Sequence, residues 1–250
     1  MDILSPETLL LLLAIGALAG WIDAIAGGGG LLTLPVLLGV GLPPLQALAT
    51  NKLQGSFGTL SATLHFLRAG EIDLRRAWPE ALAAFLGSAF GAWAVQGLET
   101  VWLQRLVPLL LIGFALYFLF SPRMGDLDSR RRLGHLGFAV LIGGGVGCYD
   151  GFFGPGTGTL FAAAYVALAG YNLRRATAHT KLLNLASNLA ALLAFIVGGE
   201  VVWLAGLTMA LGQLVGARLG AATALRHGAV IIRPLLVLVT LAISVKLLLA

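Results

Sequence analysis

Two aspartates precede glycine-rich interruptions of segments that are otherwise strongly apolar. Asp23 comes before four consecutive glycines at positions 27–30, and Asp150 opens a stretch of glycine, phenylalanine, proline and threonine that ends at Thr159. Each glycine costs a helix about 1 kcal/mol relative to alanine, so we expect helices to break at both places. Within a bilayer, broken backbone is tolerated only where protein or a water-filled cavity satisfies its polar groups. Matched breaks in the two halves of a chain indicate the substrate site of a transporter.

The chemistry expected at these breaks is the binding of a small anion. A helix that begins at a break presents unpaired N–H groups and the positive end of its dipole. Lys52 and Lys181 lie in the polar stretches that follow the breaks, and lysine offers a compact positive charge to an oxyanion. The candidate substrate-binding residues are Gly27, Gly28, Gly29, Gly30, Asn51, Lys52, Gly154, Gly156, Thr157, Gly158, Thr180, Lys181, Asn184 and Asn188.

The two aspartates have the wrong charge for an anion site, which leaves two roles open. Asp23 and Asp150 are either proton carriers that couple transport to a proton gradient, or structural groups that cap backbone N–H groups in the breaks. A charged side chain at a helix centre in a membrane costs about 2.5–3.5 kcal/mol, so each needs a partner or a wet cavity. A structural interpretation pairs Asp23 with Lys52 and Asp150 with Lys181, each pair within one half of the chain.

The composition predicts an all-α polytopic membrane protein. Of the 250 residues, 58% are hydrophobic and only 11% are charged, and the mean hydropathy is +0.93. Soluble domains carry about 25% charged residues. The apolar segments are continuous, whereas the strands of a membrane β-barrel alternate between apolar and polar residues.

Several functional classes are disfavoured by what the sequence lacks. The net charge of +5 comes mostly from loop arginines, which indicates membrane orientation and not nucleic-acid binding. The single cysteine, Cys148, excludes a disulfide within one chain. The sequence has no P-loop, no metal-ligand spacing and no nucleophile–base set, so we expect neither an ATP-driven pump nor an enzyme, and no cofactor. The N-terminus lacks a basic region and is expected to be an ordinary first span, not a cleaved signal peptide.

The apolar periodicity predicts ten helical segments. The first half contains helices at about 7–26, 31–40, 45–67, 75–97 and 101–120, and the second at about 133–153, 159–169, 173–197, 201–224 and 230–249. Asp23 is matched by Asp150 at an offset of 127 residues, and Lys52 by Lys181 at an offset of 129. We therefore expect two duplicated membrane repeats, residues 1–122 and 133–250, joined by a basic linker at 123–132.

The positions of the arginines predict that the repeats are inverted. If basic residues face the cytoplasm, the equivalent helices of the two repeats run in opposite directions, the basic linker is cytoplasmic, and both termini lie outside. The short segment in each repeat is too short to cross about 30 Å of hydrocarbon fully, so it either crosses in part or forms a re-entrant hairpin. The basic clusters are Arg68, Arg75 and Arg76; Arg123 to Arg132; Arg174 and Arg175; and Arg226 and Arg233.

Small residues and amides give two further expectations. The pairs Gly87/Gly91 and Gly216/Gly220 have the spacing at which membrane helices pack closely. Asn184 and Asn188 are four residues apart and share a helix face. Their amides either make hydrogen bonds between helices or orient the substrate.

The order and spacing of these motifs identify a family. In the first half they are residues 23–30, Pro35, Gly41 and residues 49–52, and in the second half residues 150–159, 179–181 and Asn188. Over nearly the whole chain, this pattern resembles the TauE/SafE family of sulfite exporters, also called toluene sulfonate uptake permeases. The second half departs from the first at Thr157, where the first has Gly30.

The resemblance implies a multi-pass carrier of a bacterial inner membrane, in contact with lipid, whose substrate is a small anion such as sulfite, thiosulfate or an organosulfonate. We expect a secondary transporter that exports the anion by alternating access. The alternatives are an uptake permease for thiosulfate or a sulfonate, and a channel for small anions or protons.

Overall fold

The computed structural model describes residues 5–120 and 130–227, and within these ranges all regular structure is helical. This confirms an all-α membrane fold. The helices are α1 (Pro6–Ala26), α2 (Gly29–Gly39), α3 (Pro44–Arg68), α4 (Leu74–Gln96), α5 (Thr100–Phe120), α6 (His135–Gly137), the π-helix η1 (Phe138–Gly144), α7 (Gly145–Phe152), α8 (Thr157–Ala164), the π-helix η2 (Tyr165–Ala169), α9 (Leu173–Val197) and α10 (Trp203–His227). Most of the linker at 123–132 and the expected helix at 230–249 lie outside the described residues.

Local sequence explains why the first long helix begins and ends where it does. Ser5 caps α1, its hydroxyl accepting from the backbone N of Thr8 at 3.2 Å, and Pro6 follows in the first turn. The helix ends at Gly27, whose φ of 77° lies in the left-handed region that glycine adopts without strain. The predicted break therefore occurs at the first of the four glycines.

The second break is built by a different backbone path. Gly154 and Gly156 both have positive φ values, 97° and 85°, and α8 begins directly after Gly156. The sequence predicts one regular helix over 133–153. In the structure, the helix that leads into this break contains the π segment η1. Together α8 and η2 form the short second segment, Thr157–Ala169.

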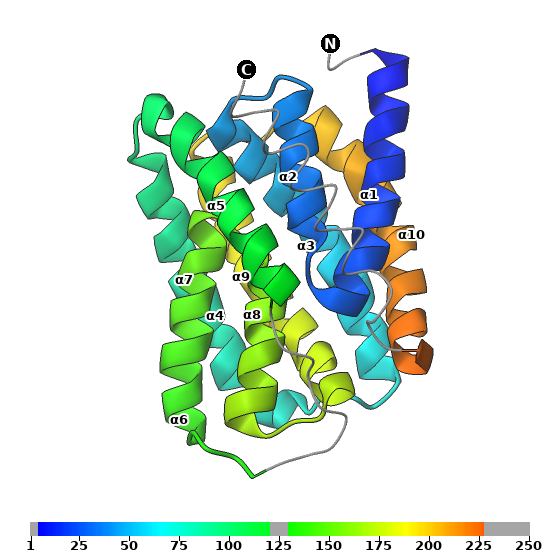
Figure 1. Ribbon diagram of the computed structural model, residues 1–250, viewed down its shortest axis with the longest axis vertical. Coiled ribbons are helices and arrows are strands. Elements are labelled where there is room, and N and C mark those ends of the chain that lie inside the picture. The colour runs from blue at the N-terminus through cyan, green and yellow to red at the C-terminus, as the bar shows by residue number, and fades with distance from the viewer. Residues whose placement is uncertain (1–4, 121–129, 228–250) are drawn as a thin grey trace.

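The helices of the two halves are interleaved. α1 of the first half packs along α10 of the second, α7 of the second half packs on α4 of the first, and α3 and α9 contact each other between them (Figure 1). Each half therefore places its opening helix against the fourth helical segment of the other. The two halves of the chain are thus intertwined, while their duplication and inverted relation stay predictions.

The two glycine pairs lie at these contacts, which confirms the expectation of close helix packing. A Cβ at Gly91 would lie 2.8 Å from the backbone N of Phe152 on α7, and a Cβ at Gly220 would lie 2.9 Å from the Cα of Trp21 on α1. Gly87 and Gly216 make equally close contacts one turn earlier. Because the obstructing atoms belong to backbone, these positions admit no side chain without moving a helix.

Three of the described helices are long and apolar enough to cross a membrane: α1, α9, and residues Trp203–Leu225 of α10. α3 and α4 are of similar length but carry more polar residues. Large apolar side chains are exposed on the outside of the bundle, among them Leu10, Leu86, Phe90, Trp93, Leu211 and Val215. Such a surface is expected where helices face lipid and not water.

Candidate functional site

The two chain breaks meet in the middle of the molecule. A Cβ placed on Gly27 would lie 2.5 Å from the carbonyl carbon of Gly158, and one on Gly158 would lie 2.5 Å from the Cα of Gly27. Thr159 adds a hydrogen bond across the contact, its hydroxyl donating to the backbone oxygen of Ala26 at 3.1 Å. The breaks, separated by more than 120 residues in sequence, thus cross with their backbones in contact.

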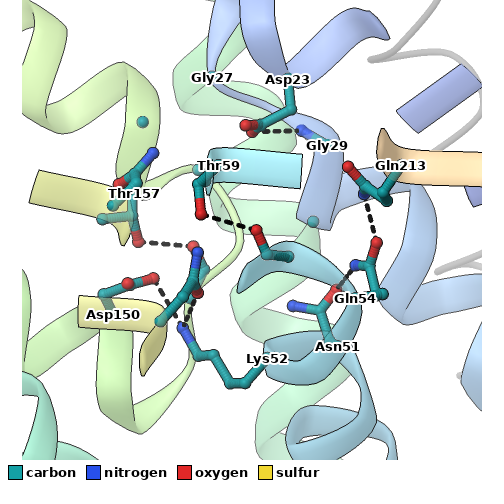
Figure 2. Close-up of a pocket in the computed structure, with 17 residues that line it drawn as sticks. Asp23, Gly27, Gly29, Asn51, Lys52, Gln54, Thr59, Asp150, Thr157 and Gln213 are labelled. Atoms are coloured by element: carbon teal, nitrogen blue, oxygen red, sulfur yellow. Dashed lines mark hydrogen bonds and ion pairs between the residues drawn. The ribbon is translucent and has the colours of Figure 1, made fainter. Parts of the chain in front are cut away.

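A pocket opens beside this crossing (Figure 2). Both breaks contribute backbone to its wall, and α3, α9 and α10 contribute side chains. Of the residues predicted from the sequence, its lining includes Asp23, Gly27, Gly29, Gly30, Asn51, Lys52, Asp150, Gly154, Gly156, Thr157, Gly158, Asn184 and Asn188. Gly28, Thr180 and Lys181 do not belong to the lining.

The buried lysines pair with aspartates across the two halves. Lys52 Nζ lies 2.8 Å from Asp150 Oδ1, and Lys181 Nζ lies 3.0 Å from Asp23 Oδ2. The expectation of pairs within each half is therefore wrong. The reason is the crossing at Gly27 and Gly158, which brings each break next to the lysine of the opposite half.

The Lys52–Asp150 pair faces the pocket. Lys52 also donates to Asn188 Oδ1 at 3.3 Å, and a Cβ at Gly154 would lie 2.7 Å from Lys52 Nζ. Asp150 Oδ2 accepts a hydrogen bond from the hydroxyl of Ser187. The ammonium group is thus held against the backbone of the second break at Gly154, whose φ of 97° is one that other residues rarely adopt.

The Lys181–Asp23 pair supports the first break. Asp23 Oδ1 accepts from the backbone N of Gly29 at 3.2 Å, so this carboxylate caps the first turn of α2. Its other oxygen is bound by Lys181, which also donates to the backbone oxygen of Asp23. Asp23 therefore takes the capping position considered from the sequence, whereas Asp150 turns toward Lys52 and Ser187.

The sequence analysis missed four lining residues: Gln54, Gly55, Thr59 and Gln213. Gln54 Nε2 donates to Asn51 Oδ1 at 2.7 Å, and Gln213 donates to Gln54 Oε1, so an amide chain joins α3 to α10. The sequence does contain a signal for two of them. Gln213 is a polar residue within a long apolar segment, and Gln54 lies about half a helical turn from Lys52.

The two amides of α9 differ in their partners. Asn188 makes the hydrogen bond between helices with Lys52, while Asn184 lines the pocket with an Oδ1 that has no hydrogen-bond partner among the described residues. The hydroxyl of Thr180 is likewise buried without such a partner. Both asparagines therefore share the face toward the pocket.

A second polar cluster lies apart from the pocket. The hydroxyl of Tyr165 donates to Glu80 Oε2 at 2.6 Å, and Arg131 lies 3.4 Å from Glu80 Oε1. His179 packs against the rings of Tyr165 and Tyr171, with ring centroids 5.6 and 5.0 Å away. These residues join the start of α4 to α8–η2 and α9 and do not line the pocket.

The lining of the pocket combines charged and neutral polar groups. Across residues 5–120 and 130–227, His, Cys, Asp and Glu form no group of three that could hold a metal ion. The pocket instead offers one ammonium group, two carboxylates, amides, hydroxyls and glycine backbone. This set can hold a small polar ion by hydrogen bonds and charge.

Comparison with known proteins adds a family and several relatives. The model of the family described as sulfite exporter TauE/SafE matches residues 12–247. The chain is 48% identical over 244 residues to the "probable membrane transporter protein YfcA" of Escherichia coli K12, with 98% of this chain and 91% of the relative covered.

It is also 44% identical over 246 residues to a "probable membrane transporter protein" of Haemophilus influenzae, covering 98% of this chain and 96% of the relative. A more distant relative is "probable membrane transporter protein YunE" of Bacillus subtilis, 23% identical over 240 residues, with 85% of this chain and 87% of the relative covered. No solved structure matches the chain.

Proposed function

The chain belongs to the sulfite exporter TauE/SafE family of membrane transporters, and on this premise we propose that it exports sulfite or a related small sulfur oxyanion. The family membership confirms the resemblance inferred from the motifs, and a transporter, not an enzyme, is what the relatives' names describe. The identity of the anion, the direction of transport and the bacterial inner membrane as its location belong to the proposal.

One observation carries the proposal: the crossing of two broken segments beside a pocket that contains a buried lysine. Gly154, Gly156 and Gly158 of the second break line this pocket, and Lys52 supplies a positive charge next to Gly154. Irregular backbone at membrane depth is stable only where it lines such a cavity. A compact oxyanion is the ligand that fits glycine backbone, an ammonium group and amides together.

We propose that the anion reaches this pocket alternately from each side of the membrane. The two repeats, residues 1–122 and 133–250, would be inverted and would rock about the crossing, with the basic linker at 123–132 in the cytoplasm and both termini outside. Outward movement is driven by a proton gradient or by the membrane potential, which favours anion exit by about 2.3 kcal/mol per charge per 100 mV.

Transport by the purified protein in proteoliposomes tests the proposal. Sulfite, thiosulfate, sulfate and methanesulfonate are offered to the wild type and to Lys52→Ala and Lys181→Ala, with Arg218→Ala as a control because Arg218 is exposed on α10 outside the pocket. We expect at least a tenfold loss of transport in both lysine variants, since each leaves a carboxylate unpaired beside the site. Arg218→Ala should transport normally.

Unchanged transport in both lysine variants would contradict the proposed site. Saturation with substrate separates a carrier from a channel, because flux through a channel would keep rising at millimolar concentrations. Right-side-out vesicles loaded inside or outside with the anion distinguish export from uptake.

A further inference from the structure

We propose that the two buried ion pairs have different tasks. The Lys52–Asp150 pair opens: Lys52 exchanges the Asp150 carboxylate for the substrate anion, and Asp150 takes up one proton. The Lys181–Asp23 pair stays closed. This inference rests on the proposed function, because it assigns how that site is coupled. It predicts that one proton travels with each anion.

The two buried lysines differ in their access to the pocket. Lys52, Asp150 and Asp23 all line the pocket, but Lys181 does not. Among the described residues, the side chain of Lys52 donates only to oxygen atoms of the pocket wall, Asp150 Oδ1 and Asn188 Oδ1, at 2.8 and 3.3 Å. An anion in the pocket can therefore replace these oxygens at Lys52, whereas it cannot reach Lys181.

The balance of charge in the site links the binding of an anion to the binding of a proton. Lys52, Lys181, Asp23 and Asp150 sum to zero when all are ionised, and their side chains are at most 20% exposed. Adding an anion to Lys52 leaves the Asp150 carboxylate without its counter-ion in a poorly solvated place, which is strongly unfavourable. A proton on Asp150 restores neutrality, so binding of a monoanion and binding of a proton favour each other.

The two aspartates differ in the partners that could accept a hydrogen bond from their protonated form. The hydroxyl of Ser187 donates to Asp150 Oδ2 and also lies 3.2 Å from the backbone oxygen of Asn184. It can therefore turn, donate to Asn184, and accept a hydrogen bond from protonated Asp150. The hydrogen-bond partners of Asp23 among the described residues are the backbone N of Gly29 and the ammonium of Lys181, which are donors only. Neither of them can accept a hydrogen bond from a protonated Asp23.

The difference between the two ion pairs corresponds to a difference in sequence between the two halves. At the offset of 129 residues that relates Lys52 to Lys181, Ser187 corresponds to Gly58. The first half thus lacks a hydroxyl at the position that serves Asp150 in the second.

Few other charged or titratable groups surround Asp150. α8 and η1 contribute none, since Thr157–Ala164 and Phe138–Gly144 contain no such residue. From α9, Lys181 is bound to Asp23, and from α4, Glu80 is bound to Tyr165 and Arg131. On α7 itself Cys148 lies two residues away, and Tyr149 donates its hydroxyl to the backbone oxygen of Pro155 at 2.5 Å. Lys52 and, across the pocket, Asp23 are the charges that remain.

The transport step involves only one O–H bond. Asp150 takes a proton from the water on the side to which the pocket is open as Lys52 moves to an oxygen of the anion. After the pocket opens to the other side, the anion leaves, Asp150 releases the proton, and the pair re-forms. For a monoanion the cycle moves no net charge, so the gradients of anion and proton set its direction. The membrane potential drives outward movement only when the anion carries a second charge.

Proteoliposomes that contain a trapped pH dye test this inference. The probes are methanesulfonate and thiosulfate, which carry no proton of their own near neutral pH, and the membrane potential is set by potassium and valinomycin. For the wild type we expect one proton per anion and, with methanesulfonate, a rate that does not change with voltage. Asp150→Asn should move anions without protons and become voltage-dependent. Asp23→Asn should lose thermal stability and rate but keep the ratio of one.

A matched pair of double variants covers the case in which a single variant does not fold, because each removes a whole ion pair and leaves no unpaired charge. Lys52→Gln with Asp150→Asn should fold and transport nothing, while Lys181→Gln with Asp23→Asn should transport slowly with a ratio of one. Anion transport without protons in the wild type, or an unchanged ratio in Asp150→Asn, would overturn the division of tasks but leave the proposed function standing. If the wild type moves no anion at all, the proposed function itself fails.

Discussion

Two glutamines next to the pocket illustrate how much a single buried amide contributes. Gln213 on α10 donates to Gln54 on α3, and both side chains are only 2–3% exposed. Gln54 in turn donates to Asn51, whose Oδ1 also accepts from Thr33 at 2.6 Å. A chain of this kind joins α2, α3 and α10 and fixes the amide that faces the pocket.

Removing both glutamines should cost less stability than the sum of the two single removals. Gln213→Met keeps the length of the side chain but leaves Gln54 Oε1 buried without a donor, which costs about 1–3 kcal/mol of stability. Adding Gln54→Met removes that orphaned group, and Asn51 keeps its bond to Thr33, so the loss in the double variant should be less than the sum of the single losses. Thermal unfolding in detergent measures the three variants, and strictly additive losses would contradict the proposed coupling.

The residue types of the site could be read from the sequence, but not their pairing. Charged and amide residues in apolar segments stand out by composition, and most of those predicted do line the pocket. The pairing of lysines with aspartates depends on how the two breaks cross at Gly27 and Gly158. This is a tertiary contact, and the local periodicity of the sequence does not indicate it. Gln213 was missed because a lone glutamine has the same appearance as any polar residue that joins two helices.

At the level of elements, helix contacts in this protein depend on the absence of side chains. α4 lies against α7, and the backbone of α7 at Phe152 occupies the place where a Cβ on Gly91 would be. The outer surface of α4 carries large apolar residues such as Phe90 and Trp93. Shape at the glycines, and not hydrophobicity, therefore selects the partner helix within lipid.

Gly91→Val should separate α4 from α7 and destabilise the protein. Overpacking usually costs about 1–3 kcal/mol, and here the obstruction is backbone that has no rotamer to change. Gly97→Ala is the matched control on the same helix end, because a Cβ there lies 3.5 Å from the backbone oxygen of Ala94 in ordinary contact. Size-exclusion profiles and melting temperatures compare the two, and equal behaviour would show that the α4–α7 contact can relax.

Helix bounds were predictable to within a few residues because the apolar runs and their glycine and proline ends are local signals. The breaks at Gly27 and between Gly154 and Gly156 followed from the same signals. The π-helices η1 and η2 were not predicted. Wider i to i+5 hydrogen bonding arises from how a helix is packed and has no distinctive composition.

For the whole molecule, the main prediction concerns its orientation in the membrane. Arginines gather at the turn between α3 and α4 and at the start of α9, whereas the turn between α4 and α5 carries Glu99. The positive-inside tendency then places the first two regions in the cytoplasm and Glu99 outside. The interleaved packing of α1 with α10 and of α7 with α4 is compatible with this inverted arrangement.

Cysteine labelling tests the orientation. In a Cys148→Ala background, a membrane-impermeant thiol reagent should label Glu99→Cys in intact cells, and should label Ala69→Cys only after the membrane is opened. Both positions are exposed, so access is limited by the membrane and not by the fold. The reverse pattern would invert the assignment, and labelling of both from outside would exclude it.

The contact between Gly27 and Gly158 has a consequence for how this chain can change over generations. Any side chain gained at one of these glycines would run into the main chain of the other break. Neither break can therefore change at this position alone, and the two glycines must be inherited as a matched set.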